Sequence, residues 1–175
     1  EYGGVDGIVN CVGSVLLKPA HLTTPTEWQD TLATNLTSAF AVIRASYKVM
    51  RKEGGSIVLM STAASRVGLA NHEAIAAAKA GVIGLMQSAA ATYASRGIRI
   101  NVVAPGLVKT KLTERIWSNE KSAEFSRNMH ALGRLGEPKD VASMIAWLLD
   151  PDNSWVTGQV FGVDGGLGTL HAAAR

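Results

Sequence analysis

Four short apolar runs, each closed by turn residues and separated by helical patterns, constrain the fold of this chain most. The runs occupy residues 5–13, 56–60, 98–104 and 158–163, and the intervening helical patterns occupy residues 24–50, 72–96 and 137–149. Buried strands that alternate with helices at this spacing predict a parallel sheet with right-handed crossovers. We therefore predict a single α/β domain, a doubly wound parallel sheet of about four strands with flanking helices.

The first helix has a well-defined start. Thr24 and Glu27 have the spacing of a capping box, and Pro25 occupies the first helical position. Asn35 falls among the apolar positions of this helix rather than on its polar face. A buried amide must find hydrogen-bond partners, so Asn35 is either a satisfied core residue or part of a functional site.

Composition excludes several classes of partner. The chain has 175 residues, of which 47% are apolar and 18% are charged, as expected for one ordinary globular domain. Its net charge is only +3 and the basic residues are scattered, which argues against nucleic-acid binding. No uncharged apolar stretch reaches the length of a membrane span, and no metal site is predicted.

The single cysteine, Cys11, cannot form an internal disulfide, which favours a reducing, cytoplasmic location. We expect Cys11 to be a small buried residue. The chain begins with Glu1 and enters a strand almost at once, so we expect it to be part of a longer product.

A hydroxyl pair and a lysine mark the candidate site. Ser61 and Thr62 follow the strand at 56–60, and Lys79 lies on the apolar stripe of the helix at 72–96. Hydroxyls at the carboxyl end of a strand, facing the first turns of a helix, are typical of an α/β active site. The alternatives are that Ser61 and Thr62 only cap the strand end and that Lys79 extends to solvent.

Several motifs in this order resemble the classical short-chain dehydrogenase/reductase family. They are Asn10-Cys11-Val12-Gly13, Asn35, Lys79, Pro105-Gly106 with Thr110, and the segments 134–138 and 157–166. The resemblance runs from about residue 5 to residue 166. It implies part of a Rossmann-like fold, NAD or NADP as cofactor, and an alcohol/ketone pair as substrate.

The resemblance also implies roles for individual residues. Asn35 would be the asparagine of the catalytic tetrad, Thr62 would hold the serine position with Ser61 as the alternative, and Lys79 would be the lysine that also binds the cofactor ribose. Asn10 and Gly13 would lie beside the adenine, and Pro105, Gly106 and Thr110 would lie near the nicotinamide. Thr110 could also cap the helix that follows it.

Two features depart from the family pattern. The glycine-rich turn that holds the pyrophosphate has no counterpart, and the tyrosine of the YxxxK pair is replaced by Ile75. Isoleucine cannot donate a proton, and losing a positioned acid typically costs about 10²–10⁴-fold in rate. His72 and Glu73 are candidate replacement acids; the alternative is that they only form a solvated first turn of the helix.

We expect an impaired or atypical oxidoreductase. The alternatives are a non-catalytic scaffold that binds a ligand or oligomerises, or a fragment without a separate function.

The resemblance also implies a bare edge in the sheet. In the family's sheet order, further strands pair against the strand that corresponds to residues 7–13, and without them this apolar strand invites pairing. We expect a second chain, or a missing amino-terminal half, to cover it. Family dimers pack through the helices that correspond to residues 24–50 and 72–96, so we expect a homo-oligomer.

The segment 111–132 mixes polar and apolar residues with a weak helical period. We expect it to be a lid over the substrate.

Overall fold

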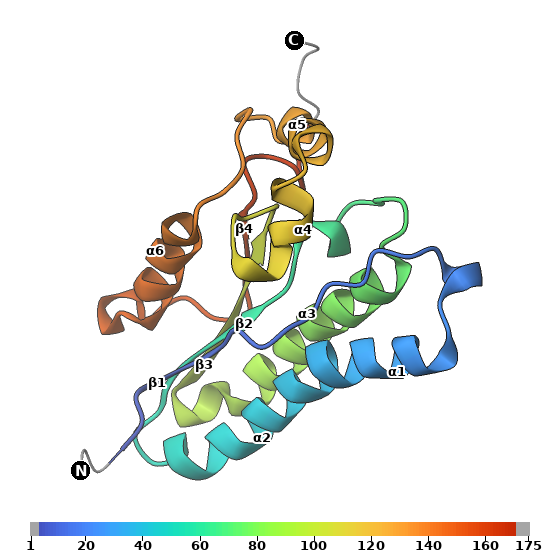
Figure 1. Cartoon of the computed structure of the whole chain (residues 1–175). Coiled ribbons are helices and arrows are strands. Elements are labelled where there is room, and N and C mark those ends of the chain that lie inside the picture. The colour runs from blue at the N-terminus through green and yellow to red at the C-terminus, as the bar shows by residue number, and fades with distance from the viewer. Residues whose placement is uncertain (1–3, 171–175) are drawn as a thin grey trace.

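The predicted parallel sheet is present. The structure is a computed structural model in which residues 4–170 are described. The four strands are β1 (Gly7–Asn10), β2 (Gly55–Met60), β3 (Ile98–Pro105) and β4 (Val160–Val163), all parallel and in the order β1-β2-β3-β4 (Figure 1). Their carboxyl ends therefore meet at one edge of the sheet, where α/β proteins place their sites.

Helices cover both faces of the sheet. One layer contains α1 (Pro25–Leu32), α2 (Ser38–Met50) and α3 (Glu73–Tyr93), and the opposite face carries α6 (Pro138–Leu149). Two shorter helices, α4 (Glu114–Trp117) and α5 (Glu120–Met129), lie near the carboxyl ends of the strands (Figure 1). The fold is thus the predicted Rossmann-like arrangement of three layers.

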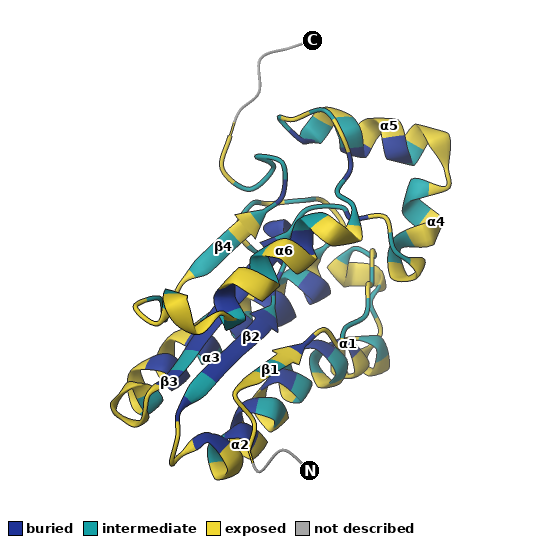
Figure 2. Ribbon diagram, turned by 90° about the vertical axis from the view of Figure 1, so that its left-hand side faces the viewer, coloured by how far each residue is buried: buried dark blue, intermediate teal, exposed yellow. Residues whose placement is uncertain are grey.

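The two central strands are apolar along their length because each face packs on helices. Ile57 and Leu59 of β2 join the core formed with α2 and α3, whereas Val58 between them packs toward α6. Strand β3 repeats the alternation, and both strands are buried in Figure 2. Burial on both faces is the reason that parallel strands read as continuous apolar runs.

The long helical segment at 24–50 begins as predicted but is not one regular helix. Thr24 Oγ1 accepts from the Glu27 backbone N–H at 3.2 Å, and Glu27 Oε2 accepts from the Thr24 backbone N–H at 2.8 Å. Between α1 and α2 the chain forms a π-helical turn over Ala33–Thr37, which contains Asn35. Such turns are rare and occur often at functional sites.

Helix α3 is the main packing element of the first layer. Its buried face includes Ile75, Val82 and Met86, and Gly97 ends the segment in a left-handed conformation. Residues Glu73–Arg96 are long and apolar enough to cross a membrane by length and composition alone. Lys79 lies within this stretch, and one face of α3 is buried against the sheet as a core helix.

Strand β1 lies at the edge of the sheet, as predicted. Within residues 4–170 it pairs only with β2, and Val9 is 38% exposed. Cys11, just beyond β1, is exposed rather than buried, so the sequence-based expectation for it was wrong. The loop after β1 runs along the rim of a cavity instead of entering the core.

Replacing Thr24 with alanine should lower the free energy of unfolding by about 1 kcal/mol, because the N-cap acceptor for Glu27 is lost. Thr92→Ala is the matched control, since Thr92 is exposed and lies inside α3 rather than at a cap. Urea unfolding followed by circular dichroism measures both variants. Equal stability of the two would contradict a stabilising capping box.

Candidate active site

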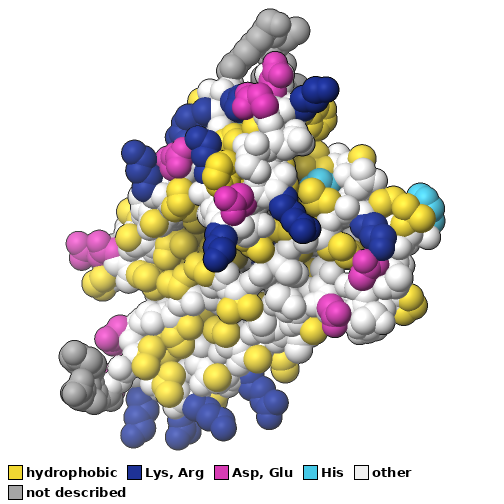
Figure 3. Space-filling view, viewed as in Figure 1, with side chains coloured by type: hydrophobic (Ala, Val, Ile, Leu, Met, Phe, Trp, Pro, Cys, Tyr) yellow, Lys and Arg dark blue, Asp and Glu magenta, His cyan; other side chains and the backbone are white. Residues whose placement is uncertain are grey.

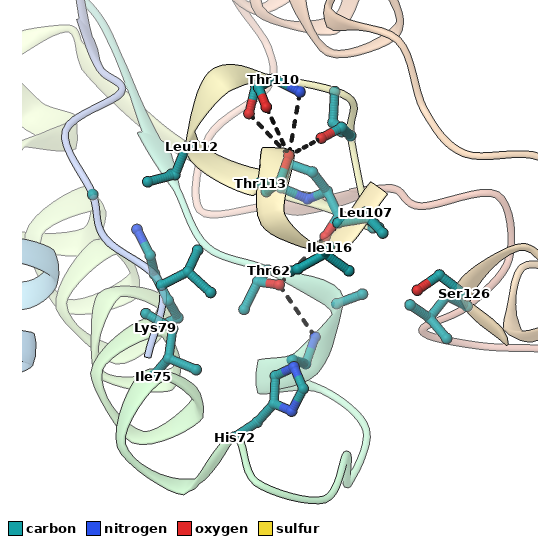
Figure 4. A pocket seen from close by; sticks show the side chains of 18 of the residues that line it. Thr62, His72, Ile75, Lys79, Leu107, Thr110, Leu112, Thr113, Ile116 and Ser126 are labelled. Carbon is teal, nitrogen blue, oxygen red and sulfur yellow. Dashed lines mark hydrogen bonds between the residues drawn. The ribbon is translucent and has the colours of Figure 1, made fainter. Parts of the chain in front are cut away.

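A cavity of about 910 Å³ opens at the carboxyl ends of β1, β2 and β3 (Figure 4). The residues predicted for the site that line it are Gly13, Asn35, Ser61, Thr62, Lys79, Pro105, Gly106 and Thr110. Asn10 does not line it: its Oδ1 accepts from the Val12 backbone N–H at 3.1 Å and so shapes the turn after β1. The fold thus brings together residues that are up to 97 positions apart in the chain, from Gly13 to Thr110.

Lys79 is held inside the cavity and does not extend to solvent. The residue is only 7% exposed, and its Nζ donates to the Met60 carbonyl oxygen at 3.0 Å. Burial lowers the pKa of Lys79, and the nearby Cys11 side chain opposes this effect. A Cβ atom at Gly13 would lie 3.4 Å from Nζ, so glycine there leaves room beside the ammonium group.

Asn35 is a fully satisfied buried amide. Its Oδ1 accepts from the Ser14 backbone N–H at 3.1 Å, and its Nδ2 donates to Ser14 Oγ at 2.9 Å and to the Thr31 carbonyl at 3.0 Å. The side chain therefore ties the loop after β1 to the π-helical turn. Its side-chain hydrogen bonds are already made, so any direct contact to a ligand would fall to its backbone.

The two hydroxyls after β2 have different environments. Ser61 is buried, and its Oγ donates to the Lys79 carbonyl oxygen at 2.9 Å. Thr62 is half-buried, and its Oγ1 has only long contacts, 3.4 Å from the Ala64 nitrogen and 3.5 Å from the Pro105 oxygen. Of the two alternatives, Thr62 has the hydroxyl better able to bind a substrate oxygen, and it also caps the turn after β2.

One face of α3 presents three residues to the cavity. His72, Ile75 and Lys79 follow helical spacing, and Figure 4 shows their side chains along the cavity wall. Ile75 offers only hydrocarbon to the cavity. Glu73 is exposed and does not line the cavity; its carboxylate accepts from the Ala20 backbone N–H at 3.4 Å.

Several residues of the segment 111–132 line the cavity. Thr110 occupies the N-cap position of its first turn; the Oγ1 atoms of Thr110 and Thr113 lie 3.1 Å apart, and Trp117 Nε1 donates to the Thr110 carbonyl at 2.8 Å. Leu112 and Phe125 line the cavity although they are 56% and 67% exposed. The assignment of this segment as a lid stays a prediction.

His130 was not identified from the sequence, although it lines the cavity and links the segments on either side of it. The residue is 2% exposed; its Nε2 accepts from the Leu107 backbone N–H at 3.2 Å, and its Nδ1 lies 2.6 Å from the Ser126 carbonyl. A Cβ atom at Gly106 would lie 2.4 Å from that Nε2, so this contact requires glycine. The Pro105-Gly106 motif marks this part of the cavity in the sequence. No sequence pattern near residue 130, however, predicts that a histidine packs against the motif.

The charged groups of the cavity are all basic. Within the described part of the chain no aspartate or glutamate lines it, whereas Lys79 and Lys121 do. No group of three or more histidine, cysteine, aspartate or glutamate residues in the described ranges could hold a metal ion. The site is therefore suited to an anionic ligand with apolar parts.

Comparisons with known proteins agree with this geometry. A family profile described as enoyl-(acyl carrier protein) reductase matches residues 1–168. The chain is 37% identical over 168 residues to a 3-oxoacyl-acyl-carrier-protein reductase, FabG, of Vibrio cholerae, covering 95% of the chain and 68% of that protein. It is 37% identical over 161 residues to a chloroplastic tropinone reductase homolog of Arabidopsis thaliana, covering 91% and 50%.

Solved structures show the same fold. A putative gluconate dehydrogenase from Agrobacterium tumefaciens superposes with a TM-score of 0.91 at 30% identity, covering 96% of the chain and 67% of the other. A variant of ElxO with NADPH bound gives a TM-score of 0.90 at 33% identity, covering 97% and 69%. The chain thus spans about two thirds of the length of these relatives.

The sheet and the site define a Rossmann-like α/β protein of the oxidoreductase class. More specifically, the chain belongs to the short-chain dehydrogenase/reductase family. NAD(P) is the cofactor of that family.

Replacing Lys79 with methionine should raise the free energy of unfolding by about 1 kcal/mol near neutral pH, because the buried ammonium group is costly to desolvate. Lys79 has a lowered pKa in the folded state, so between that value and the ordinary 10.5 the unfolded chain binds more protons. The stability of the unmodified protein therefore rises with pH across this window, and the advantage of the variant shrinks. Urea unfolding from pH 7 upward measures this; a Lys79→Met variant that is less stable throughout would contradict it.

Proposed function

We propose that this chain provides the substrate-binding and proton-handling part of an NAD(P)-dependent oxidoreductase that acts on an alcohol/ketone pair. The observation that carries the proposal is the convergence of Lys79, Asn35 and Thr62 on one cavity at the carboxyl ends of the strands. The matched relatives include proteins named as a 3-oxoacyl reductase and a tropinone reductase homolog, which supports ketone chemistry.

Some residues of the cavity are suited to holding an NAD(P) dinucleotide. Gly13 lies where a Cβ would approach Asn35 Oδ1 at 3.1 Å and Lys79 Nζ at 3.4 Å, so the chain leaves a hollow beside the buried ammonium. Lys79 would bind the ribose, and Gly106 with Thr110 would lie near the nicotinamide. When bound, the cofactor would supply or accept the hydride.

Asn10 does not extend this cradle, because its side chain is used within the turn after β1. We therefore assign Asn10 a role in positioning the loop that carries Gly13, and we propose no direct adenine contact for it.

The substrate is proposed to be a ketone with an apolar body. Hydrocarbon side chains make up much of the cavity lining, among them Leu69, Leu112, Ile116, Phe125, Met129 and Ile145. Thr62 Oγ1 would donate to the carbonyl oxygen and polarise it. Because Ile75 adds no acid beside that hydroxyl, turnover should be slow relative to a site with a tyrosine there.

A second candidate function is a non-catalytic scaffold that binds a ligand through the same cavity. Ile75 is the observation that favours it, since a buried hydrocarbon at this position serves packing and not proton transfer. In either case the exposed, unpaired Cys11 is compatible with a reducing, cytoplasmic location.

We also propose that two copies associate through α2 and α3. Phe40 on α2 is 52% exposed, and the outward face of α3 has small residues, including Ala80 and Gly84, that allow close approach. Figure 3 shows a row of lysine and arginine along its lower margin. In and just after α2, the exposed basic residues are Arg44, Lys48, Arg51 and Lys52. Like charges would repel there, so the contact should centre away from this row.

Light scattering of the purified chain should give a mass above that of one chain, and Phe40→Lys should reduce it, because a charge would be placed in the apolar contact. Lys48→Glu is the control, since Lys48 is an exposed basic residue of α2. A monomeric mass for the unmodified chain would contradict association.

Cofactor binding tests the proposed function directly. Titration with NADH and NADPH should quench the emission of the four tryptophans and raise the melting temperature with at least one of the two. Absence of binding to both would overturn the oxidoreductase proposal.

Ile75→Tyr should raise the rate of NAD(P)H-dependent ketone reduction at least ten-fold, because a phenol would be placed beside Thr62 at the spacing of the family motif. Ile75→Phe is the matched control, since it adds the ring without the hydroxyl. Equal rates for the two variants would contradict the placement of the missing acid and favour the scaffold.

A further inference from the structure

We propose that His72 is the proton donor to the substrate oxygen in this chain, a role that Ile75 cannot fill. The inference rests on the proposed reductase function and identifies the residue that completes its chemistry. The site would then have a proton donor, but one that differs from the tyrosine of the family.

The placement of His72 fits this role. The residue caps α3, lines the cavity and is half-buried. It lies one turn before Ile75 on the face that also presents Lys79, and Figure 4 shows its imidazole below Thr62 on the same side of the cavity. Thr62 and His72 both line this one cavity, so a carbonyl oxygen held by Thr62 would lie in the space that the imidazole also faces.

The hydrogen bonding of the ring fixes which nitrogen can act. His72 Nδ1 lies 2.7 Å from the Ala70 carbonyl oxygen. A carbonyl only accepts, so Nδ1 carries a hydrogen and the ring is oriented by this bond. Nε2 is then the nitrogen available to the cavity, and it donates only when the imidazole is protonated.

The other ionisable groups that line the cavity are less suitable. His130 has both ring nitrogens engaged, with the Leu107 N–H and the Ser126 carbonyl. Lys79 donates to Met60 and lies beside Gly13, at the end assigned to the cofactor. Lys121 is exposed on α5, and Cys11 is exposed on the loop after β1.

Glu73, the other candidate from the sequence, does not line the cavity. Its carboxylate instead accepts from the Ala20 backbone N–H. The structure thus distinguishes two neighbouring residues that the sequence left as alternatives.

In this step the reduced cofactor would supply the hydride and His72 would supply the proton. The carbonyl carbon gains a hydride and its electron pair, and the π electrons of the C=O bond move to oxygen. That oxygen takes the proton from Nε2 of the His72 imidazolium as the N–H bond breaks and the O–H bond forms. The ketone is reduced to the alcohol, the nicotinamide is oxidised, and the neutral imidazole regains a proton from water.

A pH dependence follows from this role. Ketone reduction needs the protonated imidazole as its acid, so its rate should fall as pH rises. Alcohol oxidation needs the neutral imidazole as its base, so its rate should rise with pH.

The test uses the whole chain with NADPH or NADH and two apolar ketones, acetophenone and 2-octanone. His72→Gln should lower kcat for reduction by about 10²-fold or more and remove the decline of the rate with rising pH, with cofactor affinity unchanged. Glu73→Gln is the matched control and should retain both the rate and the pH profile. Circular dichroism confirms that each variant is folded.

A double variant separates proton donation from a structural role. In the His72→Gln background, Ile75→Tyr should restore reduction, with the decline moved to higher pH, because a phenol then supplies the proton. Loss of the rate without recovery in the double variant, or a pH profile that His72→Gln leaves unchanged, would overturn the proposal.

Nuclear magnetic resonance of histidine labelled at Cε1 gives a readout independent of turnover. The pH midpoint of the His72 signal should shift when 1-phenylethanol is added to the complex with NADP⁺ or NAD⁺, and the His21 signal should not move. No shift of His72 would contradict contact with the substrate oxygen.

The outcomes also separate this inference from the function on which it rests. Failure to bind either cofactor would overturn both. Cofactor binding with turnover that does not depend on His72 would overturn only the role of His72. Cofactor binding with no turnover in the unmodified chain, together with turnover in Ile75→Tyr, would likewise show that His72 is not a working donor.

Discussion

Two reciprocal hydrogen bonds between the end of β2 and the middle of α3 hold the site together. Lys79 donates from its side chain to the Met60 carbonyl, and Ser61 donates from its side chain to the Lys79 carbonyl. Each residue satisfies a backbone group of the other element, so the first turns of α3 are fixed relative to the strand. The positions of Thr62, Ile75 and His72 follow from this link.

Much of the fold could be predicted because it depends on local signals. The strands at the centre of the sheet are continuous apolar runs, and the start of α1 is encoded by Thr24, Pro25 and Glu27. These features need only periodicity, capping chemistry and the rules of parallel sheets. The position of β1 at an edge was instead implied by the resemblance to the family.

The parts that could not be predicted depend on contacts between distant segments. The π-helical turn around Asn35 accompanies contacts with Ser14 on a loop 21 residues earlier in the chain, and sequence showed only an amide in an apolar stripe. His130 accepts a hydrogen bond from the Leu107 backbone N–H, 23 residues earlier in the sequence, and no local sequence pattern predicts this contact. Cys11 was expected inside the protein, but the direction of its loop places it at the cavity rim.

The absence of acidic side chains from the lining of the cavity, within residues 4–170, has a kinetic consequence. The buried Lys79 and the exposed Lys121 give the cavity a positive potential, with apolar walls that limit screening around it. Phosphate-bearing ligands would be drawn toward such an opening before any specific contact forms. Their association should therefore slow as ionic strength rises, while the encounter of a neutral ketone with the same cavity should be nearly indifferent to salt.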